Sequence, residues 1–145
     1  MAVNTVPDGF PAIPILATMD GDRLFAFLEQ TFEASLLDRQ DAPDGKPTYM
    51  TVRIGDSIIS VMRPLEEGQP TRSAFYVYVA DVDLVYGRAV AAGARSVHEP
   101  MKVVHGDRMA TLIDPFGNQW TVASRIEQIS VDELHRRLAE QQQTP

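Results

Sequence analysis

Two segments of the chain follow the same pattern, and this internal repeat is the strongest constraint on the fold. Residues 20–34 read DGDRLFAFLEQTFEA and residues 81–94 read DVDLVYGRAVAAGA, so each begins Asp-x-Asp and continues with helical spacing of apolar residues. Each segment is followed by two strand-like runs joined by a turn. These pairs of runs span 48–63 in the first half and 108–124 in the second. The sequence therefore predicts two β-α-β-β units in tandem. Each unit is too small to bury both faces of its sheet, so we expect function where the two halves meet.

The composition limits the classes of protein that are expected. The chain of 145 residues is long enough to bury a core but leaves little room for a second domain. It has no run of about 18 apolar residues, no basic N-terminal stretch and no cysteine, so we expect no membrane span, no signal peptide and a cytoplasmic location. The formal net charge of −7 argues against nucleic acid as a partner. It would suit a cationic ligand, although an acidic surface also serves solubility.

The rest of the chain reads as short elements joined by polar turns. Two prolines in 11–18 confine this strand to an edge or an end of a sheet. Ser130 and Glu133 form a capping box that opens a last helix over 130–141. The other expected segments are a loose arm at 1–10, a polar loop at 38–47, a linker at 64–72, a strand at 73–80, a short strand and loop at 96–106, and a disordered Gln-rich tail.

Alternation along the expected strands separates two faces of the sheet. One face is apolar and suits packing against helices; it carries Met50, Val52, Ile54, Phe75, Val77, Val79, Trp120 and Val122. The other face mixes aromatic, charged and small side chains; it carries Tyr49, Thr51, Arg53, Ala74, Tyr76, Tyr78, Gln119, Thr121 and Ala123. The mixed face has the composition of a pocket wall for an organic ligand, and a plain solvent-exposed face is the alternative.

The second half carries a family resemblance. The run HGDRMATLIDPFGNQWTVAS at 105–124, preceded by FYVYVADVD and AAGA, resembles the glyoxalase/bleomycin resistance/dioxygenase superfamily, also called vicinal oxygen chelate proteins. The Asp-Pro-Phe-Gly-Asn turn at 114–118 before Trp120 is typical of its glyoxalase-like branch, and so is RIGDSIISV at 53–61. Because the superfamily hosts many chemistries, the resemblance does not by itself identify a function.

The resemblance covers 10–127 and implies one α+β domain over the chain. It implies two tandem βαβββ modules, about 10–63 and about 73–127, that form an open, barrel-like mixed sheet with helices on the outer face. The helix at about 130–141 would be an addition to this fold. The resemblance also implies a homodimer, which would cover the edges of an open sheet.

The chain departs from the metal-dependent members, which place a His or Glu ligand on the first and last strand of each module. Counting from the Asp-Pro-Phe-Gly turn puts one last-strand position at Thr121, and the repeat offset of 61 residues puts its counterpart at Ser60. The first-strand positions are Ala74 and Ile13. None of the four binds a divalent metal, and the adjacent residues are no better. We therefore expect no metal and no other cofactor, which disfavours metal-dependent lyase or ring-cleaving dioxygenase activity.

Two other features have both a functional and a structural interpretation. The histidines His98, His105 and His135 have no spacing that indicates a metal site, and they read as surface residues. Arg108 and Tyr49 occupy matching places in the two halves. Arg108 is therefore either an arginine at the mouth of the cleft or a surface residue beside a turn.

Two classes of function remain open. The first is a metal-independent binding protein that sequesters an organic or antibiotic-like molecule by shape and stacking. The ligand contacts expected for it are Tyr49, Arg53, Ser60, Met62, Tyr76, Tyr78, Arg108, Trp120 (through an accessible edge) and Thr121. The second is a metal-free enzyme, such as an isomerase or cyclase acting on a natural product, with its acid or base among Tyr76, Tyr78, His105 and Asp107. A metalloenzyme with ligands from unexpected positions is a third interpretation.

We predict that the purified protein contains no stoichiometric metal, because the side chains at Ile13, Ser60, Ala74 and Thr121 do not form a divalent ligand set. Elemental analysis of protein purified without chelators, against a buffer blank, checks this. About one equivalent of Zn, Ni, Fe or Mn per chain, whose removal abolishes an activity, would contradict the assignment of the four positions.

Overall fold

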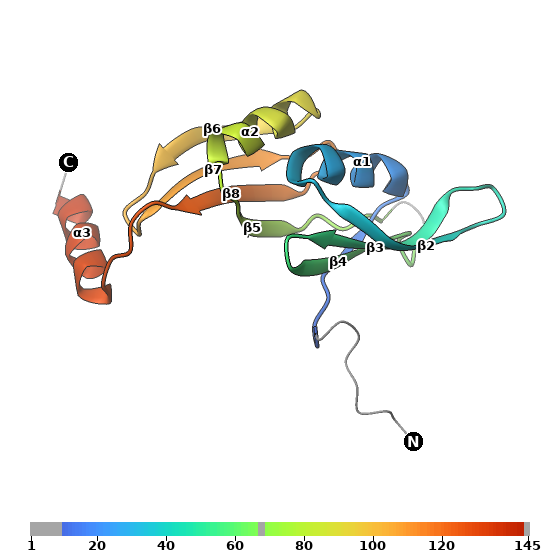
Figure 1. The fold of residues 1–145 in the computed structure, drawn as a ribbon, viewed down its shortest axis with the longest axis horizontal. Helices are drawn as coiled ribbons and strands as arrows, with labels where there is room; N and C mark the ends of the chain where they lie inside the picture. Colours follow the sequence, from blue (N-terminus) through green and yellow to red (C-terminus); the bar gives the residue numbers. More distant parts are fainter. Residues whose placement is uncertain (1–9, 67–68, 144–145) are drawn as a thin grey trace, which may run out of the picture. The chain divides into compact units, whose positions relative to one another are not determined.

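The computed structural model describes residues 10–66 and 69–143. The chain divides into two compact units, Met1–Ser73 and Ala74–Pro145. Each unit contains one mixed four-stranded sheet with a helix packed on it, and the second unit ends in a further helix (Figure 1). The α+β class and the two βαβββ modules implied by the family resemblance are confirmed, with one more strand in each unit than the repeat predicts; the described strands form no closed barrel.

The first unit consists of β1 (Ile15–Ala17), α1 (Gly21–Phe32), β2 (Ser35–Asp41), β3 (Pro47–Ile54) and β4 (Ser57–Met62). Its sheet has the order β1-β4-β3-β2, in which β1 pairs parallel with β4 and the other pairs are antiparallel. This is the arrangement of a βαβββ module, because α1 carries the chain across from β1 before the three antiparallel strands are added.

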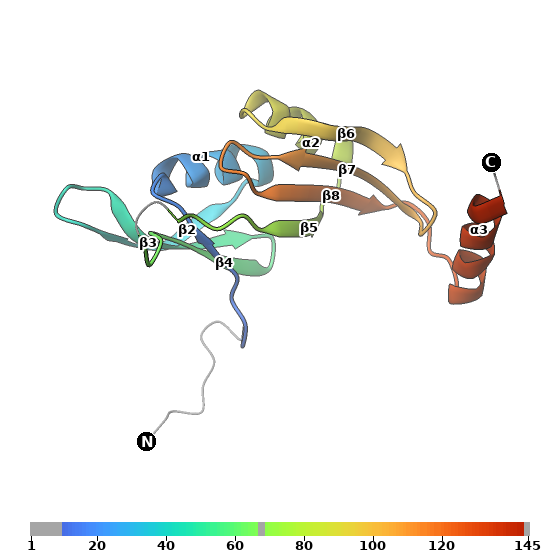
Figure 2. The same cartoon turned by 180° about the vertical axis from the view of Figure 1, so that it is seen from behind.

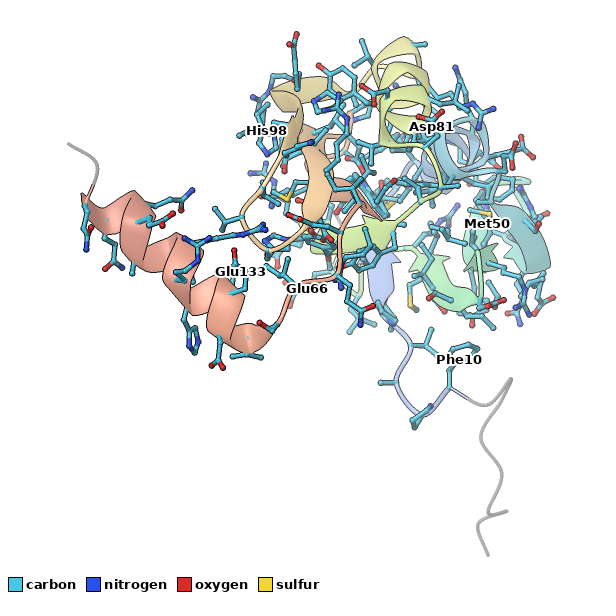
Figure 3. All side chains as sticks on the ribbon, turned by 60° about the vertical axis from the view of Figure 1, so that its left-hand side comes forward. Phe10, Met50, Glu66, Asp81, His98 and Glu133 are labelled. Carbon is cyan, nitrogen blue, oxygen red and sulfur yellow. The ribbon has the colours of Figure 1, made fainter. Side chains whose placement is uncertain are left out.

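Helix α1 forms because one stripe of its sequence is apolar at helical spacing, and that stripe packs on β3 and β4. Leu24 and Leu28 are fully buried on it. Gly21 allows the close approach at its first turn, since a Cβ there would lie 3.1 Å from Pro47 Cγ and 3.2 Å from Met50 Cε. Figure 3 labels Met50, whose side chain lies on this helix-covered face.

The second unit repeats the arrangement with β5 (Ala74–Tyr78), α2 (Val82–Ala91), β6 (Arg95–Lys102), β7 (Asp107–Ile113) and β8 (Gln119–Arg125). Its sheet has the order β5-β8-β7-β6, and β5 pairs parallel with β8. Helix α2 packs on β6, β7 and β8, and Figure 2 shows it running along them. The buried residues of this helix are Val82, Val85 and Ala89.

Capping residues read from the sequence set the ends of the helices. The side chain of Asp81 accepts a hydrogen bond from the N–H of Leu84 at 3.1 Å, as an N-cap does. Gly93 follows α2 with φ of +104°, which stops the helix in a conformation that favours glycine. Asp20 occupies the corresponding position before α1, but its side chain makes no cap hydrogen bond, so the two halves differ here.

The third helix, α3 (Val131–Gln143), begins at the expected capping box, where Ser130 Oγ accepts from the N–H of Glu133 at 3.0 Å. The helix buries none of its described residues. Arg137 attaches it to the rest of the unit through Glu127 and the carbonyl oxygen of Val104. In Figure 3 this helix, marked by Glu133, stands apart from the faces of the second sheet.

The turn between β7 and β8 explains the Asp-Pro-Phe-Gly-Asn motif. Asp114 is buried, and its Oδ1 accepts from the N–H groups of Phe116 and Asn118 at 2.8 and 2.9 Å. Its Oδ2 accepts from Asn118 Nδ2 at 2.9 Å and from Trp120 Nε1 at 2.8 Å. Gly117 takes the left-handed conformation with φ of +90°. One carboxylate therefore closes the turn and orients the first aromatic residue of β8.

Two segments differ from the expectation. The predicted polar loop at 38–47 is wrong over half of its length, because β2 continues to Asp41 and β3 begins at Pro47, which leaves only 42–46 as a loop. The strand β2 is an exposed edge with irregular register, so its sequence lacks a clean alternation. The strand in 96–106 is also longer than expected, as β6 runs over eight residues. The first residues of the arm and the end of the tail lie outside the described residues.

None of the helices in the described part of the chain combines the length and the apolar composition needed to cross a membrane.

We predict that Leu112→Ala destabilises the second unit by about 2–5 kcal/mol, because truncation of a fully buried leucine leaves a cavity. Leu84→Ala, on the exposed side of α2, is the matched control and should cost far less. Denaturant unfolding monitored by Trp120, the single tryptophan and a buried residue of this unit, measures both. Equal losses in the two variants would contradict the assignment of the core.

Candidate functional site

One face of the second sheet brings together chemically active side chains from three strands. Residues paired directly across a ladder project to the same side of a sheet. Tyr76 pairs with Thr121, Tyr78 pairs with Ala123, and Arg125 pairs with Asp107. These residues lie on the side away from α2, which is the side that strand alternation predicts for Tyr76, Tyr78 and Thr121.

A buried carboxylate forms the centre of this face. Asp107 is 0% exposed, and its Oδ2 accepts from the hydroxyls of Tyr76 at 2.7 Å and Tyr78 at 3.0 Å. Its Oδ1 accepts from Arg125 Nε at 2.6 Å. Arg125 Nη2 also donates to the hydroxyl of Tyr78 at 2.9 Å. We call the five residues Tyr76, Tyr78, His105, Asp107 and Arg125 the Asp107 cluster.

The cluster holds its protons in fixed places. Burial pushes the pKa of Asp107 upward, but the hydrogen bonds from Tyr76, Arg125 and Tyr78 outweigh it, so the pKa lies below its ordinary value. Burial of its hydroxyl end, followed by the hydrogen bond to Asp107, raises the pKa of Tyr76. At neutral pH the cluster therefore contains an ionised carboxylate and a neutral phenol.

The proton count also assigns the tautomer of His105. Its Nε2 lies 3.2 Å from Asp107 Oδ2 and 3.1 Å from the hydroxyl oxygen of Tyr76. Tyr76 has one hydroxyl proton and donates it to Asp107, so both atoms facing Nε2 are acceptors. Nε2 therefore carries a proton, and Nδ1 is the nitrogen left to face solvent or a ligand.

A glycine turn joins the two parts of the sheet that form the cluster. Gly106 stands between His105 and Asp107 with φ of +98°, and its carbonyl oxygen accepts from the N–H groups of Ile126 and Glu127. A Cβ at Gly106 would lie 2.4 Å from the carbonyl oxygen of Glu127, so a side chain does not fit. The close approach sets Asp107 opposite the end of β8.

The two tyrosine rings form an exposed aromatic surface. Tyr76 is 45% exposed and Tyr78 is 56% exposed, although both hydroxyls point to the buried carboxylate. The ring centroids are 5.3 Å apart and the rings are tilted by 50°. Met109 continues this surface beside Tyr76, whose hydroxyl lies 3.5 Å from its sulfur. The rings are thus held at their hydroxyl ends, while about half of each residue is accessible to solvent.

Four of the expected site residues lie together on the first sheet. Tyr49 pairs with Met62, and Arg53 lies on the same side, away from Met50 and α1. The Tyr49 hydroxyl lies 3.2 Å from Ser60 Oγ and accepts from Thr51 Oγ1 at 3.0 Å. This face therefore contains a neutral hydroxyl network, in contrast to the charged cluster of the second sheet.

Two expected contacts lie on the opposite face of the second sheet. Trp120 is 1% exposed and stacks on Phe75 with ring centroids 4.5 Å apart, so it has no accessible edge. Arg108 bonds Asp83 of α2 through two nitrogens, at 2.8 and 2.9 Å. Its match with Tyr49 is off by one residue, because the ladders make Met109 the counterpart of Tyr49.

Arg125 is not among the site residues predicted from the sequence. Alternation puts Thr121 and Ala123 on the mixed face, and the same alternation continued by two residues reaches Arg125. The signal for this residue is present in the sequence, but it becomes visible only when the strand is extended to Arg125.

The residues that the sequence mapping assigns to the four ligand positions do not fit a divalent metal. Thr121 Oγ1 lies 3.0 Å from Thr111 Oγ1, and Ser60 Oγ is engaged with Tyr49. Ile13 and Ala74 have no donor atom in their side chains. Within the described ranges, no group of three or more His, Asp or Glu side chains is placed to hold a metal ion. The absence of a metal remains a prediction.

Comparison with known proteins identifies the family. The model of the Glyoxalase/Bleomycin resistance protein/Dioxygenase superfamily matches residues 12–122. The chain belongs to this superfamily. The resemblance inferred from the turn at 114–118 and the strands around it is therefore confirmed.

Among solved structures, the chain is similar to TioX from Micromonospora sp. ML1, with a TM-score of 0.69 and 30% identity over 81% of this chain and 99% of that one. It also shares its fold with the fosfomycin resistance protein FosX from Listeria monocytogenes, with a TM-score of 0.60 and 20% identity over 87% of this chain and 98% of that one. The uncharacterised protein Mb0911c of Mycobacterium bovis is 28% identical over 97% of this chain and 98% of its own length.

We predict that Asp107→Asn lowers stability at neutral pH by about 1–3 kcal/mol, because it removes a charged acceptor from the buried network. A carboxylate with a lowered pKa stabilises the fold above its ordinary pKa of 3.8, and this stabilisation is lost as pH falls through the native value. The difference between the two proteins should therefore shrink in acid. Urea unfolding at several pH values measures it, and a difference that grows below pH 4 (about the ordinary pKa) would contradict the ionisation state.

Proposed function

We propose that the chain is a metal-independent small-molecule-binding protein, and that the Asp107 cluster with its exposed rings binds an organic ligand. One observation carries this proposal: Tyr76 and Tyr78 expose their rings while a buried carboxylate holds both hydroxyls. Two neighbouring rings supply area for stacking, and rings fixed at one end lose little freedom when a ligand stacks on them.

The surroundings of the rings support a ligand rather than a plain surface. Met101 pairs with Met109 on the same side of the sheet and is half exposed, so two flexible thioethers border the rings. Methionine adapts its shape to different apolar ligands. We propose sequestration of an antibiotic-like molecule as the biological role, in keeping with the bleomycin resistance proteins of the superfamily. A homodimer and a cytoplasmic location remain part of this proposal.

A second candidate is a metal-free enzyme, and the pair of His105 and Asp107 favours it. The carboxylate fixes the Nε2 proton of the imidazole, and Nδ1 of its neutral form is a potential general base. An isomerase or cyclase needs such a base beside its substrate. Turnover of a bound compound that is lost in His105→Gln, with binding retained, would favour the enzyme over the binding protein.

We predict that a planar neutral aromatic probe, naphthalene-2-methanol, binds the protein in the presence of EDTA, and that Tyr76→Leu and Tyr78→Leu each weaken binding about five- to tenfold through lost stacking. Tyr86→Leu is the matched control, because Tyr86 lies on α2 and bonds Ser96. Ligand-observed NMR titration measures the affinities. The proposal would be abandoned if the probe bound all variants equally, or bound only when a divalent metal was added.

A further inference from the structure

We infer that the ligand of the Asp107 cluster is an aromatic compound that carries a carboxylate or a similar anionic acceptor, and that Arg125 binds this group. The inference rests on the proposed function and adds the charge of the ligand to it. The overall charge of −7 suggests a cationic ligand, but the hydrogen bonds of the cluster favour the opposite sign.

Asp107 is not available to bind a cationic ligand. It is 0% exposed, Tyr76 and Tyr78 donate to its Oδ2, and Arg125 donates to its Oδ1. A cation would have to enter the buried site and replace these donors. Since the charge of Asp107 is already balanced by Arg125 at 2.6 Å, little attraction remains for a second cation.

The tyrosine hydroxyls also use their protons in hydrogen bonds within the cluster. Each has one proton, and both protons go to Asp107. The hydroxyl oxygen of Tyr78 already accepts from Arg125. The rings therefore offer their faces to a ligand, while the polar recognition has to come from another group.

Arg125 is that group. Two of its five N–H donors are used, one from Nε to Asp107 and one from Nη2 to Tyr78. Within the part of the chain that the structure describes, Nη1 and the second proton of Nη2 have no partner. These donors form the outer fork of the guanidinium, an arrangement that takes a carboxylate through two parallel hydrogen bonds.

The guanidinium of Arg125 lies over the Tyr78 ring, with its carbon 5.6 Å from the ring centre. The side chain of Arg125 is 51% exposed, so it forms part of the accessible surface next to the rings. A ligand stacked on the rings therefore has the fork within reach of a carboxylate on its edge. The nearest acid along the chain, Glu127, is paired with Arg137 and does not compete for Arg125.

The test compares three naphthalene probes of the same shape: 2-naphthoate, naphthalene-2-methanol and 2-naphthylmethylammonium. We expect 2-naphthoate to bind about tenfold or more tightly than the neutral alcohol, as one charge-assisted pair provides, and the ammonium probe to bind most weakly. In Arg125→Gln the advantage of 2-naphthoate should disappear, while the alcohol keeps its affinity to within about threefold. Arg125→Lys should retain part of the advantage, because it keeps the charge and loses the fork.

Arg136→Gln is the matched control: it removes one positive charge from an exposed arginine of α3 that pairs with Glu133 on its own helix, and should leave all three affinities unchanged. Trp120 fluorescence reports whether each variant is folded. If Arg125→Gln does not fold, two other measurements test the inference. One is the affinity of Arg125→Lys for the probes, and the other is whether the advantage of 2-naphthoate falls as the NaCl concentration rises. Equal binding of the three probes, or tightest binding of the ammonium probe, overturns the inference and leaves the proposed function standing. No binding of any probe overturns the proposed function itself.

Discussion

The buried carboxylate of Asp107 is the interaction on which the rest of the candidate site depends. An ionised group without water is costly unless it is fully hydrogen-bonded, and here four neighbouring side chains donate to it. The hydrogen bonds that stabilise this charge also direct both tyrosine hydroxyls toward the interior. They fix the Nε side of the Arg125 guanidinium in the same way. The hydrogen bonds that stabilise the buried carboxylate therefore also determine which groups remain accessible. These groups are the two tyrosine rings and the outer N–H groups of the arginine.

The two units have the same fold, and they differ in the chemistry of one face of the sheet. In both, the helix-covered side of the sheet is largely apolar, with Val52 and Val122 fully buried. On the other side the first unit has hydroxyl groups around Tyr49, and the second has the charged Asp107 cluster. A repeated fold thus keeps its core because packing constrains it, while the opposite face is free to diverge in chemistry.

The elements that were predicted well are those with strong local signals. The helix around 82–91 has an N-cap, an apolar stripe and a glycine stop, and all three are found in place. The strand β2 was missed because it is an exposed edge whose alternation is broken by two irregularities in its register. Arg108 was matched to the wrong face because a one-residue error in aligning the two halves reverses the side on which a strand residue projects.

The sequence by itself determined the repeat, both helices of the repeated units with most of their strands, and the superfamily, because these depend on local spacing and on a turn built by Asp114. It also supplied Tyr76, Tyr78, His105 and Asp107 as separate candidates. Only the tertiary structure decided that these four residues meet, that Arg125 joins them, and that the carboxylate among them is buried and already neutralised. The physical reason is that charge balance and burial belong to contacts between strands, which alternation within a single strand does not contain.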